Sequence, residues 1–154
     1  KALKTFEPLP HRLELVGTRK QIVFYNDSLA TIPEATIAAL DILGDKVATL
    51  IAGGFDRGVA LEHLGKRIEQ SNVKTLILFP DTGEKILQSM KTPPEHFSTS
   101  SMEEAVQLAY EHTPKGRICL LSPAASSFNL FRDYKHRGDE FKNWVTHYGK
   151  EKRA

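Results

Sequence analysis

Short, predominantly apolar runs alternate with amphipathic stretches along most of the chain. Three runs, at 47–52, 73–79 and 117–121, have the length and composition of buried strands. The stretches that follow them repeat apolar residues every three or four positions, which predicts helices. The first segments, 12–16 and 21–25, alternate apolar and polar residues instead. They predict a half-buried hairpin with its turn at the residues in between.

Capping residues mark where the helices should begin and end. The segment 31–34 predicts a capping box, with Thr31 as the cap and Pro33 in the first turn. This helix should end at Gly44, and it should be well buried because apolar residues surround most of it. A second capping box is predicted at 101–104.

The order of these elements predicts one α/β domain over residues 1–154. Continuous apolar strands between amphipathic helices are typical of a Rossmann-like, mostly parallel sheet with helices on both faces. The hairpin would add an antiparallel edge at the N-terminal side. In such sheets, ligands bind where the strands end and the next helices begin. Candidate chemistry should therefore lie in those loops.

Composition and charge exclude several classes of function. The 21 Lys and Arg residues against 19 Asp and Glu give a net charge of +2, too balanced for a nucleic-acid or membrane partner. Cys119 is the lone cysteine, which excludes an internal disulfide and favours a core position in a reducing compartment. No run approaches the roughly 20 apolar residues of a membrane span. The charged start at 1–4 precedes no signal-peptide run, and the basic tail at 150–153 should be solvated. We therefore expect a cytoplasmic protein.

Two strand-end loops are rich in hydroxyl and carboxyl side chains. In the loop 26–31, Asp27 suits hydrogen bonds from sugar hydroxyls and Thr31 suits a ligand carboxylate, but both are also ordinary turn residues. In the loop 122–128, a helix that started near Ser126 would offer free backbone N–H groups to an anion. Simple serine capping is the alternative there.

The loop 53–58 combines glycines with one basic side chain. The planar guanidinium of Arg57 suits bidentate capture of a carboxylate or phosphate. The alternative is a surface arginine paired with Asp56 or Glu62. The glycines allow close approach of a ligand, but they lack the spacing of a dinucleotide-binding loop.

Several catalytic motifs are missing from the sequence. There is no G-x-x-x-x-G-K-[ST] phosphate loop, so the chain should not act alone as a kinase or ligase. The serines lack a nucleophile elbow. No two of the six histidines have the spacing of metal ligands, so no metal site is expected. We therefore expect no complete catalytic set in this domain.

Four motifs, taken together and in order, resemble the C-terminal domain of the Mur ligase family. The resemblance extends from His11 to Phe141 and is greatest to the branch that adds D-glutamate. Leu29 and Ile32 depart from it, since the family often has lysine and asparagine there. The motifs are P-H-R-L-E at 10–14, Y-N-D-S-L-A-T at 25–31, G-G-F-D-R-G at 53–58 and L-S-P-A-A-S-S-F at 121–128, and the segment 131–141 also matches.

The resemblance implies a domain of a three-domain, ATP-dependent acid–amino-acid ligase of peptidoglycan synthesis. The N-terminal and central domains, absent here, would bind the uridine nucleotide and hold ATP and Mg²⁺. This domain would position D-glutamate for attachment to UDP-N-acetylmuramoyl-L-alanine and close over ATP, and it is predicted to be inactive alone. The family's D-glutamate positions fall on Arg57, Thr31, Ser127, Phe128 and Tyr134, and its nucleotide positions fall on Arg12, His11 and Asp27.

A different class of function stays open on the residues alone. The alternative is a stand-alone Rossmann-like module that binds a phosphorylated metabolite. It would use the glycines at 53–54 and a helix start at 126–127.

Overall fold

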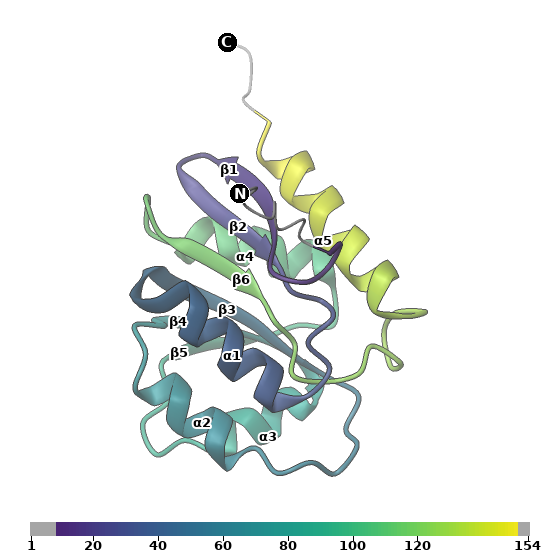
Figure 1. Ribbon diagram of the computed structural model, residues 1–154. Coiled ribbons are helices and arrows are strands. Elements are labelled where there is room, and N and C mark those ends of the chain that lie inside the picture. Colours follow the sequence, from purple (N-terminus) through teal and green to yellow (C-terminus); the bar gives the residue numbers. More distant parts are fainter. Residues whose placement is uncertain (1–8, 151–154) are drawn as a thin grey trace, which may run out of the picture.

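The computed structural model describes residues 9–150. Over this range a six-stranded sheet lies between five α-helices, which cover both of its faces (Figure 1). The expectations for residues 1–4 and 152–153 lie outside the described residues. The elements are β1 (Glu14–Arg19), β2 (Ile22–Asn26), α1 (Pro33–Leu43), a 3-10 turn (Gly44–Lys46), β3 (Val47–Gly54), α2 (Glu62–Glu69), β4 (Thr75–Asp81), α3 (Thr82–Gln88), β5 (Glu95–Ser98), α4 (Met102–His112), β6 (Ile118–Leu121) and α5 (Tyr134–Tyr148).

The sheet is parallel except at one edge. Its strand order is β1-β2-β6-β3-β4-β5, and β1 runs antiparallel to β2. The predicted fold class, including the antiparallel edge, is confirmed. The last strand, β6, lies between β2 and β3 and is hydrogen-bonded to both.

The edge hairpin differs from its prediction in turn position and register. The strand β1 continues through the expected turn, and the chain reverses at Lys20 and Gln21, which have positive φ angles of 50° and 68°. The register also shifts between Leu15 and Gly17. The expected alternation is confirmed in β2, where Ile22 and Phe24 are buried, but it fails in the bulged strand β1, where Leu15 is 57% exposed.

Alternate residues of the central strands face two separate helix layers. In β3, Leu50 packs in the cluster under α1, α2 and α3, whereas Ile51 packs in the cluster under α4 and α5. Burial of each such side chain stabilises the fold by roughly 1.5–3 kcal/mol. Cys119 lies in the second cluster and is fully buried, as predicted.

The first helix begins without the predicted capping box at 31–34. Its N-cap is Ile32, and no side chain caps its backbone N–H groups. Pro33 at the first helical position has no N–H to satisfy and already has a helical φ, so the helix starts on backbone geometry. The helix ends at Gly44, as predicted. It is buried on one side only, since Ile42 is 69% exposed, and the expectation of a well-buried helix is wrong.

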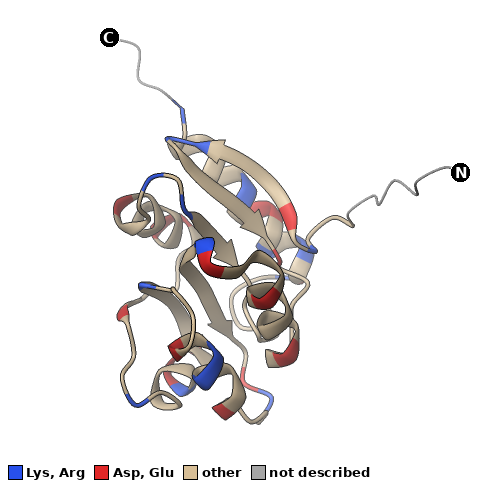
Figure 2. Cartoon of the chain, turned by 60° about the vertical axis from the view of Figure 1, so that its left-hand side comes forward, with Lys and Arg blue, Asp and Glu red and all other residues tan. Residues whose placement is uncertain are grey.

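Charged residues of both signs are interspersed over the helices and loops in the view of Figure 2. Within the described residues, every helix is too short or too polar to cross a bilayer. In a sheet of this type, ligands bind at the edge where the parallel strands end, and the candidate residues lie there.

Candidate functional site

Three loops meet where strands β2, β6 and β3 end. The chain leaves β2 and β3 toward the face of α1 and α2, but it leaves β6 toward α5 on the opposite face (Figure 1). Neighbouring strands whose loops diverge in this way create a crevice at the sheet edge. Backbone hydrogen bonds join the strand ends: Asp27 N–H donates to Leu121 O at 2.7 Å, and Gly53 N–H donates to Pro123 O at 2.9 Å.

The loop that carries Arg57 lies against the loop that follows β6. Phe55 N–H donates to Ser126 O at 2.9 Å in an isolated antiparallel bridge. The Arg57 guanidinium carbon lies 5.9 Å from the centre of the Phe128 ring, and the Phe55 ring meets Phe128 edge-on at 6.1 Å. Ser127, beside Phe128, is buried. The structure thus brings Arg57 against Phe128, the sequence neighbour of Ser127, as the sequence predicts.

Arg57 keeps its guanidinium at the surface. Its neighbour Asp56 forms an ion pair with Lys85 and accepts a hydrogen bond from Gly58 N–H at 2.8 Å. The Lys85 hydrogen bond, followed by that of Gly58, lowers the pKa of Asp56 below its usual value. Asp56 is thereby engaged by Lys85, and the exposed Arg57 stays available to an anionic ligand.

No helix starts near Ser126, so the helix N-terminus that an anion site there would have required is absent. The segment between Leu121 and Tyr134 is irregular, and Ser126 is extended where it pairs with Phe55. A turn follows, in which Leu130 and Phe131 N–H both donate to Ser127 O. One of the two supports for a stand-alone phosphate-binding module is therefore missing.

The residues expected at the nucleotide lie together at the end of β2. Asp27 is buried: its Oδ1 accepts from Leu13 N–H at 3.0 Å, and its Oδ2 accepts from Ser122 Oγ at 2.7 Å. Burial raises the pKa of Asp27 more than these bonds lower it. Arg12 is exposed and lines a groove of about 220 Å³ with Asp27, Leu29 and the alanines of α1.

The two other predicted residues fall on the same side of the site. The Tyr134 ring lies edge-on to His11, with 5.9 Å between ring centres, and Tyr134 O accepts from Ser28 Oγ at 2.7 Å. Tyr134 therefore lies beside the nucleotide group rather than against Arg57. Thr31 is half-buried and follows Ala30, which lines the groove beside Arg12.

A buried arginine joins the two halves of the site, and sequence reasoning missed it. Arg137 is 1% exposed, and burial lowers its pKa to about 10, so it stays charged at neutral pH. It donates to Ser28 Oγ at 2.9 Å, to Ser28 O at 2.7 Å and to Ala125 O at 2.9 Å. Two signals were available: its place in the segment 131–141 that resembles the family, and its place four residues before Phe141, on the buried stripe of α5.

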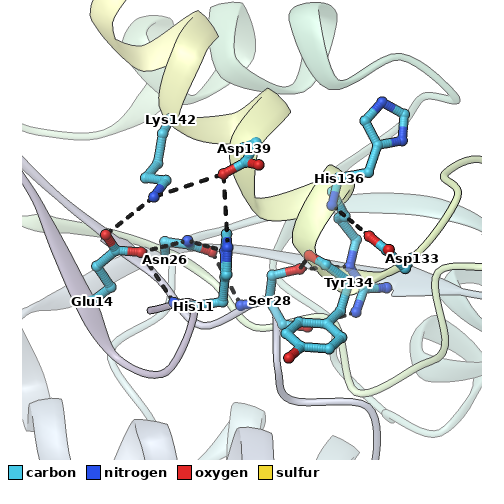
Figure 3. Close-up of polar contacts among 10 residues, drawn as sticks. His11, Glu14, Asn26, Ser28, Asp133, Tyr134, His136, Asp139 and Lys142 are labelled. Carbon is cyan, nitrogen blue, oxygen red and sulfur yellow. Dashed lines mark hydrogen bonds and ion pairs between the residues drawn. The ribbon is translucent and has the colours of Figure 1, made fainter. Parts of the chain in front are cut away.

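A second polar network ties residues 11–14 to α5 (Figure 3). Glu14 accepts from Asn26 Nδ2 at 3.0 Å and pairs with Lys142 at 3.1 Å. Burial alone would raise the pKa of Glu14, but the hydrogen bonds from His11 N–H, Lys142 and Asn26 outweigh it and lower that pKa. The ring of His11 completes the network, with its Nδ1 at 2.9 Å from Asn26 and its Nε2 at 3.7 Å from Asp139.

Comparison with known proteins identifies the family. Residues 11–125 match the family model of the Mur ligase, glutamate ligase domain. The chain belongs to this family. Among Mur ligases, it is 42% identical over 140 residues to UDP-N-acetylmuramoylalanine–D-glutamate ligase of Aquifex aeolicus. It is 41% identical over 145 residues to the enzyme of that name from Bdellovibrio bacteriovorus.

The chain spans about a third of the length of these curated relatives. The two matches cover 91% and 94% of this chain but 34% and 31% of the relatives. Solved Mur ligases share the fold. A MurF ligase from Thermotoga maritima in complex with ADP aligns with a TM-score of 0.61 at 17% identity, over 94% of this chain and 33% of that one. A domain from a putative ligase of Haemophilus ducreyi also gives 0.61 at 16% identity, over 88% of this chain and 98% of that one.

Proposed function

We propose that this chain is the C-terminal, amino-acid-accepting domain of an ATP-dependent ligase that adds D-glutamate to UDP-N-acetylmuramoyl-L-alanine in peptidoglycan synthesis. Family membership and the names of relatives at about 40% identity support this assignment. The observation that carries it is the meeting of Arg57 with the loop 126–128 at the sheet edge. A cation beside hydroxyl groups and an aromatic ring suits a small acidic amino acid.

D-glutamate would be held mainly through its side-chain carboxylate. Arg57 provides the cation, and Phe128 beneath its guanidinium limits the directions in which that group can point. The Ser127 hydroxyl belongs to the same proposed set, and Thr31 and Tyr134, which lie on the nucleotide side of the site, would contact the ligand from there. Their role is to place the incoming amine against the activated carboxylate and to exclude water.

The nucleotide would contact the end of β2. Arg12 is assigned to the phosphates, His11 stands beside it, and Asp27 is assigned to the ribose side. ATP supplies the phosphoryl group that activates the substrate carboxylate. Among residues 9–150, no three His, Cys, Asp or Glu side chains form a group able to hold a metal, so the proposal routes no step of this domain through Mg²⁺.

The rest of the enzyme belongs to the same proposal. Residues 1–154 would form one domain, and separate N-terminal and central domains would hold the uridine nucleotide, ATP and Mg²⁺. The isolated domain would then be inactive, since it lacks a phosphate loop. A cytoplasmic location follows from the proposed substrates, because ATP and nucleotide-linked sugars are made there.

Steady-state kinetics of the full-length enzyme test the role of Arg57. Arg57→Ala should raise the KM for D-glutamate and lower kcat/KM. The fall in kcat/KM should correspond to a loss of ~1.5–3 kcal/mol in transition-state stabilisation, the scale of a lost charge-assisted contact. Arg57→Lys should recover part of the loss. Arg19→Ala is the matched control, because Arg19 is the exposed last residue of β1, whereas the first residue of that strand, Glu14, lies near the site. An unchanged KM for D-glutamate in Arg57→Ala would remove this residue from the pocket.

The assignment of substrate needs a separate experiment. Phosphate release by the full-length enzyme is measured with UDP-N-acetylmuramoyl-L-alanine, ATP and a panel of D- and L-amino acids. Turnover confined to D-glutamate is expected. Calorimetry of residues 1–154 with nucleotides adds a second check, since tight nucleotide binding by this chain alone would favour the stand-alone module instead.

A further inference from the structure

Arg12 sits in an unusual stretch of backbone. The residues on either side of it, His11 and Leu13, both have positive φ angles, 66° and 43°. Such conformations cost roughly 1–3 kcal/mol each for residues other than glycine, and they persist only where the surroundings enforce them. The structure must therefore contain groups that hold this turn in place.

Backbone bonds fix one side of the turn. Leu29 N–H donates to His11 O at 2.9 Å, and Leu13 N–H donates to Asp27 Oδ1 at 3.0 Å. His11 N–H donates to Glu14 Oε1 at 3.1 Å. The turn is thus anchored to the loop after β2 and to the first residue of β1.

Asn26 holds the other side. It is fully buried, and its Oδ1 accepts from Ser28 N–H at 3.1 Å, which orients its amide. Its Nδ2 therefore faces both His11 Nδ1 at 2.9 Å and Glu14 Oε1 at 3.0 Å. An amide nitrogen has two protons to donate, so one goes to each partner and His11 Nδ1 acts as an acceptor. The Nε2 proton of the ring then faces Asp139.

Helix α5 closes the arrangement from outside (Figure 3). Lys142 Nζ lies 3.1 Å from Glu14 Oε2 and 3.8 Å from Asp139 Oδ1. The helix can approach this closely because of Gly138, where an added Cβ would lie 2.1 Å from His11 Nδ1. The His11 ring therefore occupies space that any other residue at 138 would fill.

We propose that Asn26 and Glu14, with Lys142 behind them, are positioning residues for Arg12. They hold the strained turn so that the guanidinium of Arg12 stays directed into the groove beside Asp27. This inference rests on the proposed nucleotide contact of Arg12. A preformed orientation spares the entropy of ordering a long side chain when the phosphates bind.

The test compares kinetic constants of the full-length ligase for its two small substrates. Asn26→Ala should lower kcat/KM for ATP about tenfold or more, with KM for D-glutamate changed less than about twofold. Glu14→Ala should act in the same way, and Glu14→Gln should restore most of the loss because its Oε1 still accepts from Asn26 and His11 N–H. Lys142→Met should give a smaller loss. Asn143→Ala and Lys115→Met, at exposed positions, are the matched controls.

A double-mutant cycle decides whether these residues act through Arg12. In an Arg12→Ala background, Asn26→Ala or Glu14→Ala should cost less than about a further twofold, because the group they position is gone. Fully additive losses, or equal losses for ATP and D-glutamate, would overturn the inference alone. If Arg12→Ala leaves the ATP constants unchanged, the proposed nucleotide contact fails and the inference fails with it. Should Asn26→Ala not fold, the Glu14 pair and Lys142→Met still give the answer.

Discussion

Replacing Arg137 with methionine would test how much one buried guanidinium contributes to the free energy of unfolding. Methionine keeps an unbranched side chain in α5 but cannot donate to Ser28 or Ala125. Each buried acceptor left without a partner costs about 1–3 kcal/mol. Three acceptors lose their donor, and relief from burying a charge offsets part of that cost. We expect a net loss of ~3–5 kcal/mol, a large fraction of the 5–15 kcal/mol typical of a domain.

Urea unfolding of the 154-residue chain measures this loss. Trp144, the single tryptophan, lies half-buried on α5 and reports on the same helix. The midpoint should fall with little change in the slope, since the folded surface stays the same. Arg137→Lys should recover little, because one ammonium group cannot reach three acceptors in the geometry of a planar fork.

The matched control is Arg67→Met. Arg67 pairs with Asp41 at the surface, so its loss should cost under about 1 kcal/mol. A loss under about 1 kcal/mol for Arg137→Met, or full rescue by lysine, would refute the view that this side chain stabilises the fold by linking the loop after β2 to the loop after β6.

Three further substitutions probe the fold. Because the pKa of Glu14 is lowered in the folded state, its ionised form stabilises the fold above its ordinary pKa of 4.5. The difference in unfolding free energy between wild type and Glu14→Gln should therefore be present at pH 7 and shrink as the pH falls below 4.5. Urea titrations at several pH values measure this difference. Ser101→Ala should cost about 1 kcal/mol in thermal unfolding, since Ser101 caps α4, whereas Thr31→Ala should cost less than about half of that, and equal losses would contradict the observed caps. Gly65→Ala should destabilise by about 1–3 kcal/mol rather than stabilise α2, because its Cβ would lie 2.1 Å from Ser89 Oγ; a raised melting temperature would show that this contact can relax.

The central strands were predictable because their signal is local. A strand buried on both faces is mostly apolar, so the segments 47–52, 73–79 and 117–121 stand out in the sequence, and β3, β4 and β6 confirm them. The hairpin turn was not, since its place depends on a bulge that the pairing of two strands creates. Local cap residues also misled, as the segment 31–34 shows.

Some features of the candidate site were also predictable from the sequence, and others were not. The meeting of Arg57 with Phe128 follows from the rule that parallel strands end at one edge, so sequence order was enough. Arg137 bonds to a residue 109 positions away, and Asn26 bonds to Glu14 across the hairpin. The partners of such buried polar groups are set by tertiary packing, and the residue types alone do not name them.

The place of β6 has a consequence for synthesis on the ribosome. Until residues 118–121 emerge, β2 and β3 each lack a neighbour on their inner edge, and both are rich in apolar residues. Open edges of this kind invite pairing with other chains. The nascent polypeptide must therefore stay shielded until β6 has emerged, and any product that terminates before β6 should aggregate.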